Sequence, residues 1–248
     1  MTTAGTGAAR LPMAAGTGGR SETELRRLVR HGGAALESAP AQDIIMWAVA
    51  TFGRRLAITS SMNDAVLAHL ASTVATDIDV VFLDTGYHFA ETIETRDTVA
   101  ATLSVNVVTV TADQTVAEQD AAYGKDLFAR DPDLCCALRK VRPLEDQLAG
   151  YDAWATGLRR DETHDRADVP VVGWDRTKRK VKFSPLARWS AQDVEHYIRE
   201  FGVPVNPLQH DGYPSIGCWP CTRRVAPGED PRGGRWAGTG KTECGIHQ

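Results

Sequence analysis

The chain has 248 residues, of which 42% are hydrophobic and 24% charged, a composition typical of one globular α/β domain with appendages. Its formal net charge of −4 gives no overall electrostatic reason to bind nucleic acid or an anionic membrane surface. No apolar run approaches the roughly 20 residues of a membrane-spanning helix, so we expect neither nucleic acid nor a membrane as a partner.

The N-terminal segment, residues 1–19, is rich in Gly, Ala and Thr and lacks the apolar stretch of a signal peptide. We predict a disordered leader there and a cytoplasmic protein. In that compartment cysteines are metal ligands or reactive thiols more often than disulfides. The count of five cysteines leaves at least one thiol unpaired in any pairing scheme.

The first half of the chain alternates between helical and strand-like patterns. A capping-box pattern from Ser21 to Glu24 begins a helix that we expect to end at Gly32-Gly33. The further helices expected in this half are 40–52, 64–75 and 89–103, and the expected strands are 55–59, 79–83 and 105–110. This alternation predicts an open, mostly parallel sheet with helices on both faces.

The second half is less regular. The helices expected there are 115–123, 135–148 and 190–202; the expected strands are 151–156 and a short hairpin of 169–174 with 180–183. Residues 203–248 are rich in Gly and Pro and predict a loop, which is unusually long unless something holds it in place. We therefore divide the chain into a leader (1–19), an α/β domain with a metal centre (20–225) and a C-terminal tail (226–248).

Four of the cysteines form two pairs. Cys135 and Cys136 are adjacent on a predicted helix, and Cys218 and Cys221 form a C-x-x-C in the loop. Four thiolates match the ligand number of a [4Fe–4S] cluster, a [2Fe–2S] cluster or a structural zinc ion. Neighbouring helical residues diverge by about 100°, which disfavours one zinc ion without excluding it. We favour [4Fe–4S]; a Cys218–Cys221 redox dithiol is the alternative, although no thioredoxin-like sequence surrounds it.

The fifth cysteine, Cys244, lies near the end of the chain in Glu243-Cys-Gly-Ile-His247. Cationic neighbours favour the reactive thiolate; the candidates are Arg232, Arg235, Lys241 and His247, while Glu243 opposes ionisation. Lys140 lies four residues after Cys136 and is expected on the same helix face. The alternatives are an inert terminal cysteine and an ordinary surface lysine.

Polar residues also follow three predicted strands. Ser60-Ser61 precede a helix, whose N-terminal N–H groups can bind phosphate, although ordinary N-capping would use the same residues. Leu83-Asp84-Thr85-Gly86 follow the second strand, where ligands of parallel sheets bind; a simple Asp-Gly turn is the alternative.

The fourth strand is followed by Gly157-Leu158-Arg159-Arg160, with Arg166 nearby. Guanidinium groups bind phosphate and sulfate oxygens through paired hydrogen bonds. The alternative is a solvated loop in which neighbouring carboxylates, those of Asp161, Glu162 and Asp165, neutralise the arginines.

Several of these motifs resemble the assimilatory sulfonucleotide reductases, in particular the cluster-bearing adenosine 5′-phosphosulfate (APS) reductases. The motifs are Leu-Asp-Thr-Gly-Tyr-His-Phe-Ala-Glu-Thr (83–92), Cys-Cys-Ala-Leu-Arg-Lys (135–140), Cys-Trp-Pro-Cys (218–221), Arg-Gly-Gly-Arg-Trp (232–236) and Glu-Cys-Gly-Ile-His (243–247). The Ser60-Ser61 junction resembles a glycine-poor form of the loop of the adenine-nucleotide hydrolase-like (PP-loop) superfamily. The resemblance extends from about residue 55 to residue 247.

The resemblance implies the fold of that superfamily, a [4Fe–4S] cofactor and the reduction of APS to sulfite and AMP by thioredoxin, through an S-sulfocysteine on Cys244. The implied catalytic residues are Cys244, His247 and Lys140, with His247 as one source of positive charge. The implied substrate-binding residues are Ser60, Ser61, Leu83, Asp84, Thr85, Gly86, Gly157, Leu158, Arg159, Arg160, Arg166, Arg232 and Arg235. The implied metal ligands are Cys135, Cys136, Cys218 and Cys221.

Three other functions stay open at this stage. They are reduction of the 3′-phosphorylated substrate (PAPS), ATP-dependent tRNA sulfur transfer on the same fold, and a non-enzymatic redox sensor. The sequence does not decide the oligomeric state, and a homo-oligomer is compatible with it.

Overall fold

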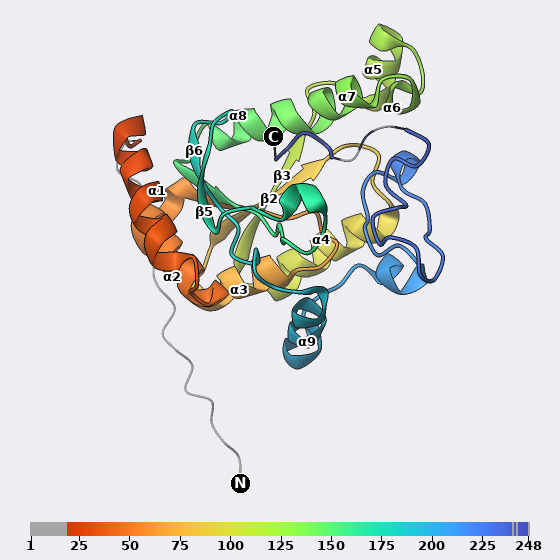
Figure 1. The fold of residues 1–248 in the computed structure, drawn as a ribbon. Coiled ribbons are helices and arrows are strands. Elements are labelled where there is room, and N and C mark those ends of the chain that lie inside the picture. The colour runs from red at the N-terminus through yellow and green to blue at the C-terminus, as the bar shows by residue number, and fades with distance from the viewer. Residues whose placement is uncertain (1–18, 240, 242, 248) are drawn as a thin grey trace.

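A computed structural model describes residues 19–239, 241 and 243–247 (Figure 1). The predicted leader, apart from Gly19, therefore lies outside the described residues. Within the described chain, no helix is long and apolar enough to cross a membrane.

Six strands form one sheet in the order β3-β2-β1-β4-β6-β5. The strands are β1 (Leu56–Thr59), β2 (Ile78–Asp84), β3 (Val105–Thr111), β4 (Ala153–Ala155), β5 (Val172–Asp175) and β6 (Lys180–Phe183). All neighbouring pairs are parallel except β5 and β6, which form an antiparallel hairpin at one edge. The predicted mostly parallel sheet is confirmed, and so is the terminal hairpin.

The helices pack on both faces of this sheet (Figure 1). They are α1 (Glu22–Leu36), α2 (Ala41–Phe52), α3 (Val66–Val74), α4 (Ala90–Thr102), α5 (Val116–Tyr123), α6 (Leu127–Arg130), α7 (Pro132–Cys136), α8 (Arg142–Leu148) and α9 (Ala191–Phe201). Short 3-10 turns cover Gly53–Arg55, His164–Arg166, Pro207–Asp211 and Trp219–Cys221.

The alternation of side chains along β1 shows how the two faces are built. Leu56 and Ile58 point into the larger core, which α1, α2, α3 and α4 cover. Ala57, between them, points to the other face, where it joins Trp154 of β4 and Leu144 of α8. The second core is small, and Ile246 of the C-terminal tail packs against it. The tail is therefore part of the packing on the α8 face.

The predicted end of the first helix was wrong. α1 continues through Gly32 and Gly33 to Leu36. A Cβ atom on Gly32 would lie 3.1 Å from Cη2 of Trp47, so this glycine permits close packing of α1 on α2. Packing against α2 and β5 thus overrides the local tendency of the glycine pair to end a helix.

The predicted helix 135–148 is interrupted. α7 carries Cys135 and Cys136, a π-helical turn covers Ala137–Val141, and α8 follows. Pro143 has no N–H to donate to the carbonyl of Arg139, which explains why regular α-helix does not run through this point. Lys140 lies in the π-helical turn, a feature often found at functional sites.

Residues 203–239 are mostly loop, as predicted, but main-chain hydrogen bonds hold them. The N–H of Trp236 donates to the carbonyl of Cys221 at 2.9 Å, and the N–H of Arg223 donates to that of Gly234 at 2.9 Å. The chain therefore folds back on the C-x-x-C segment before it enters the last part of the tail.

Candidate functional site

Three of the predicted loops meet at the carboxyl edge of the sheet. The N–H of Ser60, after β1, donates to the carbonyl of Val81 in β2 at 3.1 Å. The hydroxyl of Thr59 donates to the carbonyl of Ala155 in β4 at 3.0 Å. Parallel pairing of β2, β1 and β4 thus brings the loops after these strands to one place, where ligands of such sheets bind.

The loop after β1 uses one of its two serines for its own turn. The hydroxyl of Ser60 accepts a hydrogen bond from the N–H of Met62 at 3.2 Å, whereas Ser61 is exposed. Met62 is completely buried and has a φ of 59°, a left-handed conformation that costs free energy for a residue other than glycine. Ser60 therefore stabilises this turn, and Ser61 presents its hydroxyl to solvent.

The loop after β2 connects the sheet edge to the cysteines. The carboxylate of Asp84 accepts a hydrogen bond from the N–H of Gly86 at 2.9 Å, and Gly86 has a φ of 72°. Thr85 is buried, and its hydroxyl lies 3.3 Å from Sγ of Cys218. One tight turn therefore reaches from the strand end to the C-x-x-C segment.

The loops after β2 and β4 contain further residues of the implied substrate-binding set. The carbonyl of Leu83 accepts a hydrogen bond from Nε2 of His88 at 2.8 Å. After β4, Gly157 is half-buried and Leu158 is buried, with an exposed fraction of 4%. A base at this edge would share the Leu83 carbonyl with His88.

The structure separates the two arginines after β4. Nε of Arg159 donates to Asp161 at 3.0 Å, an ion pair at the surface. Arg160 instead donates to the carboxylate of Glu37 at 2.5 Å and to the carbonyl of Val169 at 2.9 Å. The expectation that Arg160 faces the ligand crevice is therefore not met, because its guanidinium holds the end of α1 against the loop before β5.

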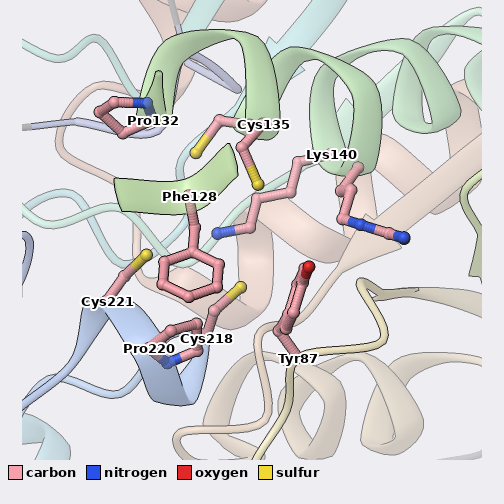
Figure 2. A pocket seen from close by; sticks show the side chains of 10 residues that line it. Tyr87, Phe128, Pro132, Cys135, Lys140, Cys218, Pro220 and Cys221 are labelled. Carbon is pink, nitrogen blue, oxygen red and sulfur yellow. The ribbon is translucent and has the colours of Figure 1, made fainter. Parts of the chain in front are cut away.

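All four paired cysteines line a single pocket (Figure 2). Cys135 and Cys136 come from α7, and Cys218 and Cys221 from the distant C-x-x-C turn; all four are free thiols. Burial raises the pKa of Cys135 to about 12 and that of Cys221 to about 11. These thiols stay protonated at neutral pH unless a metal replaces the proton.

The donor set of this pocket fits an iron–sulfur cluster better than one metal ion. Among the described residues, no three His, Cys, Asp or Glu side chains are arranged to hold a single ion. A four-iron cube binds one thiolate at each iron, so it accepts sulfurs spaced more widely than the ligands of one zinc ion. The four thiols around this pocket supply one ligand for each iron.

Lys140 is half-buried and lines this pocket, and its ammonium group points toward the sulfurs (Figure 2). Burial alone would lower the pKa of Lys140. Electrostatic interactions with the sulfurs of Cys218, Cys244 and Cys136 outweigh this effect and raise the pKa above its usual value. Lys140 therefore interacts with the four-cysteine pocket and with the fifth cysteine.

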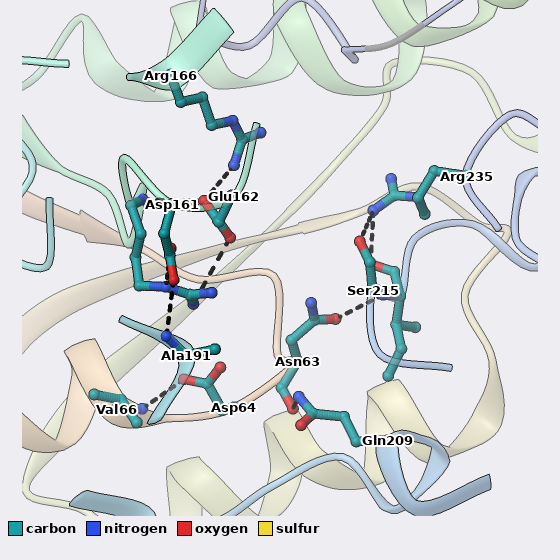
Figure 3. Close-up of polar contacts among 12 residues, drawn as sticks. Asn63, Asp64, Val66, Asp161, Glu162, Arg166, Ala191, Gln209, Ser215 and Arg235 are labelled. Atoms are coloured by element: carbon teal, nitrogen blue, oxygen red, sulfur yellow. Dashed lines mark hydrogen bonds and ion pairs between the residues drawn. The ribbon is translucent and has the colours of Figure 1, made fainter. Parts of the chain in front are cut away.

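The tail contacts two arginines of the predicted substrate set. Arg166 donates two hydrogen bonds to the carboxylate of Glu243, from Nε at 2.8 Å and from Nη2 at 2.7 Å. It also pairs with Glu162 at 2.5 Å (Figure 3). Nη2 of Arg232 lies 3.5 Å from the carboxylate of Glu243, and the ammonium of Lys241 pairs with Asp133. The tail is therefore closed over the site.

Arg235 is held in place by the loop before the C-x-x-C. Its Nη1 lies 3.2 Å from the hydroxyl of Ser215 and 3.2 Å from the carbonyl of Ile216 (Figure 3). Burial and the charge of Arg232 lower the pKa of Arg235, and its electrostatic interaction with Cys244 opposes this shift. Arg235 is therefore a rigidly held cation close to Cys244.

The last described residues pack on the α8 face of the sheet. The ring of His247 lies parallel to the indole of Trp154, with centroids 5.8 Å apart and an angle of 6°. Burial lowers the pKa of His247 well below its usual value, and Lys182 and other cations lower it further. This environment favours the neutral form of the His247 ring.

Three residues outside the predicted site contact this end of the tail: Trp154, Lys178 and Lys182. The ammonium of Lys178 donates to the carbonyl of Ile246 at 2.9 Å. Alternation in the strand Lys-Val-Lys-Phe predicts that Lys182 shares a face with Lys180, but nothing local indicates that the tail covers that face.

Comparison with known proteins agrees with this architecture. The model of the phosphoadenosine phosphosulfate reductase domain family matches residues 55–224. The chain is 63% identical over 228 residues to the adenosine 5′-phosphosulfate reductase of Streptomyces coelicolor, covering 92% of this chain and 97% of that protein. It is 53% identical over 227 residues to the protein of the same name from Mycolicibacterium smegmatis, covering 92% and 96% of the two chains.

Solved structures support the fold. The phosphoadenylyl-sulfate (PAPS) reductase of Candida auris superposes with a TM-score of 0.67 at 28% identity, covering 81% of this chain and 97% of that one. The FMN adenylyltransferase of Candida glabrata superposes with a TM-score of 0.52 at 12% identity, covering 86% and 69%, which shows a shared fold alone. The predicted adenine-nucleotide hydrolase-like architecture is confirmed, and the chain belongs to the phosphoadenosine phosphosulfate reductase domain family.

Proposed function

We propose that this protein reduces adenosine 5′-phosphosulfate to sulfite and AMP, with Cys244 as the nucleophile and thioredoxin as the electron donor. One observation carries the proposal. Cys244 lies outside the four-cysteine pocket, yet it is close enough to Lys140 and Arg235 to interact electrostatically with both. A free thiol among half-buried cations suits attack on an anionic sulfo group. The relatives named as adenosine 5′-phosphosulfate reductases support the choice of substrate.

In the first step, the Cys244 thiolate attacks the sulfur of the sulfo group. A new S–S bond forms, the bond from sulfur to the bridging oxygen breaks, and AMP leaves with that electron pair. The product on the enzyme is S-sulfocysteine. Lys140, Arg232 and Arg235 neutralise charge on the sulfo and phosphate oxygens as the two anions approach.

In the second step, a thioredoxin thiolate attacks Sγ of Cys244 and expels sulfite. The second thioredoxin thiol then resolves the mixed disulfide and regenerates Cys244. The dithiol supplies two electrons and becomes a disulfide, so the overall reaction balances without another reductant.

The strand-end loops hold the nucleotide in this proposal. Arg166 binds the phosphosulfate, and the exposed hydroxyl of Ser61 faces the same edge. The remaining contacts come from Ser60, Leu83, Asp84, Thr85, Gly86, Gly157, Leu158 and Arg159. Arg160 is left out because Glu37 and Val169 engage its guanidinium.

A [4Fe–4S] cluster held by the four pocket cysteines, Cys135, Cys136, Cys218 and Cys221, belongs to the proposal. When bound, it would supply a local charge that tunes the site, and neither step passes electrons through it. We place the protein in the cytoplasm, because a reducing compartment keeps cluster ligands and a catalytic thiol from forming disulfides.

The proposal is tested by intact-protein mass spectrometry after anaerobic addition of APS without reductant. We expect a mass gain of one sulfo group that maps to Cys244, is absent from Cys244→Ser and is removed by reduced thioredoxin. An adduct on another residue, or none on protein with a full complement of iron, would overturn the proposed mechanism.

Reduction of PAPS is the second candidate, because the matching family model and the Candida auris structure carry that name. We propose a preference for APS on the basis of the more similar curated relatives. A steady-state kcat/KM for PAPS equal to or above that for APS would reverse this order.

A further inference from the structure

The end of the tail occupies a site built from β4, β6 and the turn between β5 and β6. Ile246 packs against the small core that contains Trp154. The ammonium of Lys178 donates to the carbonyl of Ile246 at 2.9 Å, and that of Lys182 lies 3.5 Å from the carbonyl of His247. The site therefore contacts the tail through an aromatic face and two cations.

The two lysines are unusual because they are largely buried. The side chain of Lys178 is 1% exposed and pairs with Asp175 at 3.6 Å. Burial lowers the pKa of Lys182 to about 8. Both ammonium groups lie over the indole of Trp154, at 5.5 Å and 5.0 Å from its centroid. Burying cations costs free energy unless they find partners, and the tail carbonyls add partners to those that Asp175 and the indole supply.

The environment of Lys182 differs from that of the other residues of β6. Val181 and Phe183 point into the larger core, so Lys180 and Lys182 share the opposite face. Lys180 instead donates to the carbonyl of Tyr151 at 2.6 Å, and it makes no hydrogen bond to the described part of the tail. Two lysines of one strand face thus have different partners, which provides a matched control.

A second contact holds the tail on the other side of Cys244. Glu243 pairs with Arg166 and Arg232, which bind the substrate anion in the proposed function. A bound anion would compete for these guanidinium groups, so the Glu243 contact must open. Trp154, Lys178 and Lys182 bind no part of the substrate in that proposal, so their contact with the tail can persist.

We propose that Trp154, Lys178 and Lys182 form a tail dock that positions Cys244 for attack, by holding Ile246 and His247 while substrate displaces Glu243. This inference rests on the proposed function for its purpose, although the dock can be tested without catalysis. Cys244 is two residues from Ile246, and two residues of extended chain span at most about 7 Å. Fixing Ile246 therefore confines the thiol to a small volume.

Confinement of a nucleophile raises the rate of reaction more than it changes substrate affinity. Loss of the dock should therefore slow S-sulfonation of Cys244 at saturating APS by about tenfold or more. The dissociation constant for APS should change by less than about threefold, because the dock does not touch the nucleotide. If the dock only stabilised the fold, its loss would not slow S-sulfonation while leaving the dissociation constant for APS nearly unchanged.

The experiment compares Lys178→Met and Lys182→Met with Lys180→Met in the cluster-loaded protein. The first readout is peptide-mapped alkylation of Cys244 by iodoacetamide without substrate. The second is single-turnover S-sulfonation by APS, with APS affinity measured separately. We expect faster alkylation and slower sulfonation for the two dock variants, wild-type behaviour for Lys180→Met, and partial rescue by Lys182→Arg.

A variant in the tail controls for misfolding of the sheet in the lysine variants. His247→Ala removes the ring stacked on Trp154 without altering the domain, and it should show the same faster alkylation. Wild-type alkylation rates in His247→Ala and in the folded lysine variants would overturn the dock. Wild-type protein that forms no adduct with APS would overturn the proposed function instead, while the alkylation comparison would still decide the dock.

Discussion

The carboxylate of Glu243 accepts two hydrogen bonds from the guanidinium of Arg166, at 2.8 Å and 2.7 Å. This paired geometry is the one with which arginine binds phosphate and sulfate. In the closed tail, the two carboxylate oxygens of Glu243 therefore occupy the guanidinium of Arg166. In the proposed function, the same guanidinium binds the phosphosulfate of the substrate. The enzyme must exchange one anion for the other in each turnover.

Glu243→Gln should bind APS more tightly than the wild type. The amide keeps the shape of the side chain but loses the charge that competes for Arg166, so the dissociation constant should fall by about threefold to tenfold. Equilibrium binding to the Cys244→Ser background measures this effect without turnover. Glu229→Gln is the matched control, because Glu229 pairs with Arg223 in an exposed part of the tail. Unchanged or weaker binding by Glu243→Gln would contradict the competition.

The two neighbouring arginines, Arg160 and Arg166, should behave differently when each is changed to Gln. Arg166→Gln removes a paired donor from the site and should raise KM for APS by roughly 10- to 100-fold. Arg160→Gln removes an ion pair with Glu37 that is partly exposed, so it should lower the free energy of unfolding by about 1 kcal/mol or less. Kinetics and urea unfolding of both variants check this, and a large KM effect of Arg160→Gln would restore it to the substrate site.

Asp152→Asn should destabilise the fold in a pH-dependent way. The side chain of Asp152 is 4% exposed and pairs with Arg55 at 2.8 Å and Arg20 at 3.3 Å. Burial alone would raise the pKa of Asp152, but hydrogen bonds from Arg55 and Arg20 lower it below its usual value. Loss of the carboxylate should cost about 1–3 kcal/mol at pH 7.

The sign of that effect follows from proton linkage. A lowered pKa in the folded state means that the unfolded chain binds the proton more tightly. The stabilisation is therefore complete above the ordinary aspartate pKa of about 4 and is lost as the pH falls through the lower folded value. Urea unfolding at pH 7 and at decreasing pH below 4 should show the difference between wild type and Asp152→Asn becoming smaller. A constant difference would show that the charge does not matter.

Metal analysis should separate a cluster from zinc. We expect about four iron atoms and four acid-labile sulfides per chain after anaerobic purification. Cys221→Ser should lose most of both, because it removes one of four ligands, whereas Cys244→Ser should retain them. One zinc ion per chain with no sulfide would contradict the cluster.

The glycine pair inside α1 gives a prediction about packing. Gly32→Ala places a Cβ atom 3.1 Å from Trp47 and should lower the free energy of unfolding by about 1 kcal/mol or more. At Gly33 the nearest atom would be the carbonyl oxygen of Val172 at 3.5 Å, an ordinary contact. Gly33→Ala should therefore be neutral or stabilising by up to about 1 kcal/mol, because alanine favours helix. Equal effects of the two changes in thermal unfolding would contradict this account.

Much of the fold could be predicted from local patterns. The alternation of β1, α3, β2, α4 and β3 follows from hydrophobic periodicity and capping residues within short windows. The same parallel order brings the loops after β1, β2 and β4 to one edge, because parallel strands end on the same side. The end of α1 could not be predicted, since it depends on the contact of Gly32 with Trp47.

For the site, local sequence is enough to identify the reactive groups: four paired cysteines, a fifth near the C-terminus, and cations close to each in sequence. Which of these groups meet depends on long-range packing. Arg160 pairs with Glu37, 123 residues away in the sequence. His247 stacks on Trp154 of β4, which is also distant from it in the sequence. The lowered pKa of His247 also depends on tertiary contacts, because burial and the nearby cations Lys182, Arg166 and Lys178 cause it. Contacts over such separations depend on how whole faces pack, and a local pattern of residue types contains no information about them.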